Sequence, residues 1–252
     1  MINFQKLYDF NVELHQLAGS VLTTDIRDND ERSIYSAFVI AKGYKTHEAI
    51  LLLCKHGYGE DAFMLARTLT ELSIQTSYIL SDKYNERLAR YIEHDWVIRK
   101  QMYDYLRTKD ELKHELLKRA DNEPDKMATI EQVEKEYKRV MDKYHYKLNN
   151  GWSDKNIFGM AEETGRSREY KTVYKLQCIL CHTNVRSTDE YVKETNDGLV
   201  INIGPNQESI EQALVASFDF FRCLLEEGIT QFKWPLESKL ENLYHRFGDQ
   251  VK

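Results

Sequence analysis

Proline and glycine are scarce in this chain. Only three prolines and eleven glycines occur among 252 residues, whereas 42% of the residues are hydrophobic and 30% are charged. Because proline and glycine mark turns, their scarcity argues against a fold of many short strands and favours long helices. We therefore predict an all-α fold, a multi-helix bundle with central apolar helices and one small peripheral β-hairpin. No linker or internal repeat interrupts it, which predicts one helical domain over residues 1–252.

Long hydrophobic runs and an excess of positive charge are also missing. The longest apolar run, AILLLC at residues 49–54, is too short to span a bilayer. The first residues, MINFQKLYDF, lack the pattern of a signal peptide. We therefore expect a cytoplasmic protein with no membrane partner. The formal net charge of −6 argues against a broad nucleic-acid surface, although it leaves room for a local basic cleft.

Cysteine is rare, and no complete metal or cofactor signature is present. The four cysteines lie in apolar helical sequence and are expected to be reduced core thiols: Cys54, Cys178, Cys181 and Cys223. Cys178 and Cys181 have the CxxC spacing of redox or metal sites, but the second pair that a structural zinc site needs is missing. The ExxH from Glu111 to His114 occurs once, whereas di-iron proteins need two. We predict no metal and no cofactor.

The catalytic motifs that can be recognised locally are absent as well. The sequence contains no GxxxxGK[ST], GxGxxG, GxSxG or HExxH. Nucleotide hydrolysis by a P-loop, dinucleotide binding, serine hydrolysis and zinc proteolysis therefore lack their signatures.

Helical periodicity dominates the residues that are present. An Asn-Asp-Gly turn at residues 196–198 lies between two short strand-like runs and predicts a β-hairpin. Proline, glycine and capping residues separate the other segments. The predicted long helices cover residues 3–22, 31–56, 60–80, 84–106, 124–148, 167–185, 207–232 and 235–247. A short helix is predicted from a capping box at Thr108 and Glu111 to about Arg119, and another within residues 152–165.

One polar pair interrupts the most apolar of these helices. Arg67 and Glu71 lie four residues apart and share a helical face. On the later helix, Tyr174 and His182 form part of a comparable stripe. If the two faces meet, the four residues create a buried cluster of guanidinium, carboxylate, phenol and imidazole. Such a cluster is either a self-satisfied structural network or a pocket in which His182 transfers a proton and Arg67 holds an anion.

The order of these motifs resembles a known family. The pattern AIxLLxxxGYxxDAxxLxRTLxE runs from Ala49 to Glu71, and Gly151-Trp152 and the Tyr-Tyr-His helix follow it. The Tyr-Tyr-His helix carries Tyr170, Tyr174 and His182. This order is similar to the bacterial helical family catalogued as domain of unknown function 5677. The resemblance covers about residues 30–230, with amphipathic terminal helices outside it. It implies an α-helical fold and no particular activity.

A second comparison concerns helical ribonucleases of the HEPN type (higher-eukaryote and prokaryote nucleotide-binding domains). These enzymes carry an Arg and, a few residues later, a His on a helix, and Arg87 and His94 in RLARYIEH have that spacing. Leu88 departs from the polar residue that usually follows the Arg. A looser version pairs Lys175 with His182.

The sequence is compatible with two functions. The first is a cytoplasmic helical binding or interaction module, expected to be a homo-oligomer because tyrosines and apolar helix faces are abundant. The alternative is a metal-independent, RNA-directed nuclease or toxin of a bacterial defence or stress system. RNA or a small anionic ligand is the corresponding partner. The candidate site residues are His182, Arg67, Glu71 and Tyr174, with Arg87 and His94 as the alternative.

Overall fold

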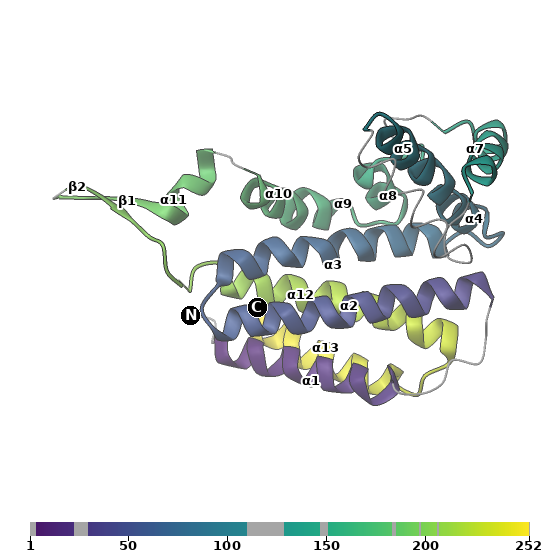
Figure 1. The fold of residues 1–252 in the computed structure, drawn as a ribbon. Coiled ribbons are helices and arrows are strands. Elements are labelled where there is room, and N and C mark those ends of the chain that lie inside the picture. Colours follow the sequence, from purple (N-terminus) through teal and green to yellow (C-terminus); the bar gives the residue numbers. More distant parts are fainter. Residues whose placement is uncertain are drawn as a thin grey trace. The chain divides into compact units, whose positions relative to one another are not determined.

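The computed structural model describes residues 4–22, 30–109, 129–146, 151–182, 185–196, 198–205 and 207–251. These residues form a helical protein with a small two-stranded antiparallel sheet, which confirms the predicted fold class (Figure 1). Their backbone contacts group into two compact units, one before residue 82 and after residue 156, the other between them. The structure thus divides into two compact units, and the single domain over residues 1–252 remains a prediction.

The first unit contains most of the helices and both strands. Its long helices are α1 (Phe4–Leu22), α2 (Glu31–Lys55), α3 (Gly59–Leu80), α12 (Ile210–Phe232) and α13 (Glu237–Val251). Its shorter elements are α8 (Ile157–Glu163), α9 (Ser167–Glu169), the π-helical turn η1 (Tyr170–Tyr174), α10 (Lys175–Cys181), the 3-10 turn η2 (Val185–Ser187), α11 (Thr188–Tyr191), β1 (Val192–Thr195) and β2 (Gly198–Ile201).

The core of this unit lies where α2, α3 and α12 pack against one another, and α1 covers α2 and α12. The bundle therefore has central apolar helices, as the sequence predicted. Fully buried apolar side chains come from all three, and each stabilises the fold by about 1.5–3 kcal/mol through its removal from water. Gly43 lets α2 approach α12 closely, because a Cβ there would lie 2.7 Å from Leu224 Cδ1.

A polar group lies in this apolar core. His47 is fully buried, and its Nε2 lies 2.9 Å from Asn11 Oδ1. The amide of Asn11 donates to the carbonyl oxygens of Leu7 and Leu214, at 2.8 and 3.1 Å, so its oxygen is the acceptor and His47 Nε2 carries the proton. Ser217 Oγ also donates to Asn11 Oδ1, at 3.1 Å. We call Asn11, His47 and Ser217 the core polar network.

Capping explains where α2 begins. The carboxylate of Asp30 accepts hydrogen bonds from the backbone N–H groups of Arg32 and Ser33, at 2.9 and 3.0 Å. Asp30 therefore satisfies two of the amides that the first helical turn leaves without partners, and the start predicted from its sequence is confirmed.

The second unit contains α4 (Glu86–Glu93), α5 (Asp95–Arg107) and α7 (Ile130–Tyr144). α5 packs against α7 around the buried side chains of Val97, Val140 and Tyr146. The single helix predicted over residues 84–106 begins at Glu86 and is interrupted at His94, which itself keeps right-handed helical angles.

The predicted hairpin is also confirmed. β1 and β2 pair antiparallel, with Val192 opposite Ile201 and Thr195 opposite Gly198. In Figure 1 the two strands extend away from the helices of the first unit. Every residue of β2 is exposed, so the hairpin is peripheral, as expected.

Candidate functional site

Five residues of α3 form a row of polar contacts along one face of the helix, four through their side chains and Met64 through its backbone oxygen. Positions 60, 64, 67 and 71 follow the spacing of a helical face, and Thr70 adjoins them. Each contacts a residue of the segment from η1 to α11. We call this set the polar row; its α3 members and their partners are Glu60 with Tyr191, Met64 with Cys181, Arg67 with Tyr174, Thr70 with Gln177, and Glu71 with Tyr174.

Three of the predicted site residues meet at the centre of the polar row. Arg67 Nη2 donates to Glu71 Oε1 at 2.8 Å and to the Tyr174 hydroxyl at 3.1 Å. The Tyr174 hydroxyl in turn donates to Glu71 Oε1 at 2.5 Å. Tyr174 is buried, whereas the side chains of Arg67 and Glu71 are 26% and 31% exposed. The triad therefore lies at the rim of the core, and the pair predicted to be buried is only partly so.

The electrostatics of the triad favour one protonation state. Burial lowers the pKa of Arg67, but hydrogen bonds to Tyr174 and Cys181 and the negative charge of Glu71 outweigh it and raise the pKa overall. The pKa of Tyr174 is raised by burial and by its hydrogen bond to Glu71. At neutral pH Arg67 is therefore charged and Tyr174 neutral. Neither group titrates near pH 7, so this geometry is suited to holding a conformation.

The row continues towards α10 with neutral groups. Thr70 Oγ1 donates to Gln177 Oε1 at 3.0 Å, and both residues are fully buried. The thiol of Cys181 lies 3.8 Å from the backbone oxygen of Met64, at the distance of a weak hydrogen bond. The α10 segment is thus held on α3 by polar contacts as well as by apolar ones.

His182 does not join this cluster. α10 ends at Cys181, and His182 follows it with extended backbone angles and an exposed side chain. The predicted four-residue cluster is therefore corrected to three residues. Helical spacing from Tyr174 placed His182 on the same stripe, but the helix ends at Cys181, one residue before the histidine.

The alternative pair lies in the second unit. The ring of His94 packs edge-on against Tyr146, with centroids 5.1 Å apart. Its pKa is lowered by burial and by the charge of Arg90, so His94 is neutral at pH 7. Arg90 donates to both carboxylate oxygens of Asp154, at 3.0 and 2.6 Å, and to the backbone oxygen of Trp152. For Arg87 the structure shows a backbone N–H that donates to Asp82 at 2.9 Å.

No metal site emerges in the part of the chain that the structure describes. Within it, no three His, Cys, Asp or Glu side chains are grouped so that they could hold a metal ion. Glu111 and His114 of the single ExxH lie outside the described residues, as does the short helix predicted from Glu111 to about Arg119. Nor does any described helix combine the length and hydropathy that a membrane span requires.

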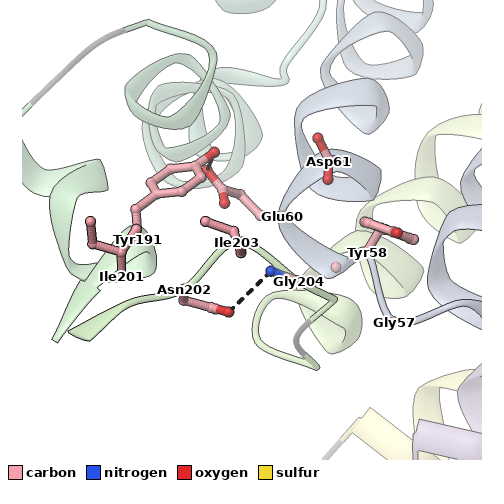
Figure 2. A pocket seen from close by; sticks show the side chains of 10 residues that line it. Gly57, Tyr58, Glu60, Asp61, Tyr191, Ile201, Asn202, Ile203 and Gly204 are labelled. Carbon is pink, nitrogen blue, oxygen red and sulfur yellow. Dashed lines mark hydrogen bonds between the residues drawn. The ribbon is translucent and has the colours of Figure 1, made fainter.

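A pocket that the sequence did not predict lies where β2 returns to α3. It has a volume of about 300 Å³ and is lined by Gly57, Tyr58, Gly59, Glu60, Asp61, Tyr191, Ile201, Asn202, Ile203 and Gly204 (Figure 2). The Tyr191 hydroxyl donates to Glu60 Oε1 at 2.8 Å. Burial raises the pKa of Glu60, although this hydrogen bond opposes the shift. The GYGED sequence at residues 57–61, where α3 begins, was the signal that could have located the pocket.

A comparison of the chain with models of known families gives the same family that the sequence motifs resemble. The model of the family of unknown function (DUF5677) matches residues 34–199, which is more than half of the chain. The chain belongs to this family. The match runs from α2 to β2, so it includes the polar row and most of the hairpin. No curated protein and no solved structure matched the chain.

Proposed function

We propose that this protein is a cytoplasmic helical interaction module whose binding surface is the hairpin arm, the residues from 191 to 204 around β1 and β2. One observation supports this most. The large apolar side chains of β2 and the residues after it face solvent: Leu199 is 72% exposed, Ile201 69% and Ile203 95%. Clustered apolar exposure of this kind marks interaction surfaces in folded proteins.

The arm is also unprotected as a strand edge. Proteins usually guard an edge strand with charge, proline or a covering element. No charged residue occurs from Gly198 to Pro205, and a hairpin of two short strands is marginal without packing. A partner that covers the arm would therefore bury apolar surface and supply missing backbone hydrogen bonds.

For the predicted site residues we propose a positioning role. Arg67, Glu71 and Tyr174 fasten the segment before the arm to α3, and Glu60 and Tyr191 hold the base of the arm itself. Because Arg67 already pairs with Glu71 and Tyr174, the triad supports this role better than the binding of RNA or a small anion. The four free cysteines suit a reducing cytoplasm.

Photo-crosslinking in living cells that express the protein tests the proposal. A photoreactive amino acid in place of Ile203 should give a covalent adduct of one reproducible mass, whose second chain is identified by mass spectrometry. The same amino acid in place of Tyr84, a position of the second unit that is 85% exposed, is the control and should give none. Absence of an adduct from position 203 would contradict the proposal.

The nuclease alternative is tested on the purified chain. We expect it to leave a mixed RNA pool intact with and without added metal. If RNA is cleaved, and H182A or H94A abolishes cleavage while the helical circular dichroism is kept, the chain is an enzyme and the interaction role is secondary.

A further inference from the structure

The outward-facing backbone groups of β2 can be assigned from its pairing with β1. The N–H of Asn202 donates to the backbone oxygen of Tyr191 at 2.7 Å, so this pair is hydrogen-bonded within the hairpin. In an antiparallel ladder, hydrogen-bonded and non-hydrogen-bonded pairs alternate. The residues of β2 whose N–H and C=O groups point away from β1 are therefore Leu199 and Ile201.

These two residues are spaced symmetrically about Val200. If a second β2 strand runs antiparallel alongside the first, Leu199 of one copy can lie opposite Ile201 of the other, and the reverse. Both outward pairs of backbone groups then find partners, and Val200 lies opposite Val200 on the axis. Leu199 and Ile201 of both copies share one face of the sheet because side chains alternate along a strand.

Charge favours a second copy as the occupant of this edge. Like charges opposite one another destabilise a sheet, and β2 has none to bring together. The nearest positive charge on β1, Lys193, forms an ion pair with Glu208 at 2.7 Å. An uncharged edge is therefore complementary to itself, whereas it offers a charged peptide no partner.

We infer that two copies of this chain associate through β2, forming a continuous four-stranded antiparallel sheet with Val200 on the two-fold axis. This inference rests on the proposed interaction role and names its partner. The pairing adds one short strand interface between two hairpins and is small by the standard of stable complexes, so we expect association that depends on protein concentration.

Sedimentation velocity with charged variants tests the inference. The wild-type chain should shift from monomer to dimer as its concentration rises towards about 1 mM. V200K and V200E should each stay monomeric, because each places like charges opposite one another, and their equimolar mixture should regain the dimer. V185K changes another exposed valine of the first unit and should associate like wild type. Circular dichroism checks that every variant keeps its helices.

A monomeric wild-type chain over this range would overturn the inference, and so would dimers that persist in V200K. A mixture of V200K and V200E that stays monomeric would overturn the register about Val200. As a second measurement, V200C should form a disulfide-linked dimer under mild oxidation while V185C does not, because residues opposite one another in a non-hydrogen-bonded pair lie within disulfide reach. An adduct of position 203 with a different protein, together with a monomeric chain, would reject the second copy and leave the interaction role standing.

Discussion

Two polar networks of the first unit differ in burial and in charge. The core polar network of Asn11, His47 and Ser217 is fully buried, and its members are neutral. The triad of Arg67, Glu71 and Tyr174 contains two opposite charges, and both charged side chains keep contact with solvent. The first can tolerate burial because neutral groups need only hydrogen bonds, whereas the second keeps its charges at the rim, where water offsets part of the desolvation cost.

The energetic consequences of mutation should differ in the same way. A fully buried donor or acceptor that loses its partner has no water to replace it. At the rim, water can enter and solvate the group that remains. The core polar network should therefore be the more sensitive of the two.

The largest effect is expected for N11A. This change leaves the buried His47 Nε2–H without its acceptor. It also removes the Asn11 contacts of the Leu214 carbonyl and the Ser217 hydroxyl, which still bond each other at 3.2 Å. The free energy of unfolding should fall by about 3 kcal/mol, measured by urea denaturation. Q16A, on the exposed face of the same helix, is the matched control. A loss no larger than that of the control would contradict the comparison.

The pH dependence of stability provides the next test. Burial, with the neighbouring His15 as a smaller cause, lowers the pKa of His47 from 6.5 to about 3. The unfolded chain therefore binds the proton more readily than the folded one. The stabilisation contributed by neutral His47 is fully present above pH 6.5 and is lost as the pH falls towards 3. Between pH 6.5 and 5 the loss should approach about 1.4 kcal/mol per pH unit.

H47Q should flatten this slope in denaturation curves recorded at several pH values. H245Q, which changes an exposed histidine of α13, should keep it. An unchanged slope in H47Q would show that another group governs the acid sensitivity.

Smaller effects are expected at the triad. R67A and E71A should each cost about 1–2 kcal/mol, less than the about 3–5 kcal/mol expected for a fully buried pair, and Y174F about 1 kcal/mol. A double-mutant cycle on Arg67 and Glu71 should give a larger coupling energy than the same cycle on Asp95 and Arg99, an exposed pair with the same spacing. Equal coupling energies would mean that the partial burial of the triad has no energetic effect.

The smallest effect on folding is expected at the hairpin. Replacement of residues 194–199 by a short turn should leave the helical circular dichroism intact and change the free energy of unfolding by about 0.5 kcal/mol or less. Global unfolding would show that the hairpin belongs to the core. In the same variant, concentration-dependent association should be lost.

Local sequence patterns predicted the parts of the fold that depend on neighbouring residues. Asp30 marked the start of α2 because a cap needs only the next few amides. The turn before Gly198 predicted the hairpin, and the spacing of Arg67 and Glu71 predicted their ion pair. The helix predicted to Val185 ends at Cys181, since periodicity does not report a π-helical turn or an early helix end.

The sequence by itself determined most of the helical segments, the hairpin and the pairing of Arg67 with Glu71, because each depends on residues a few positions apart. Only the tertiary structure decided that Tyr174 joins this pair while His182 does not, and that His47 lies in the core. The hydrogen bond from Asn11 to Leu214 joins residues 203 positions apart in the chain. Contacts of that kind depend on how whole helices pack, and the periodicity of one helix carries no information about the face that another presents to it.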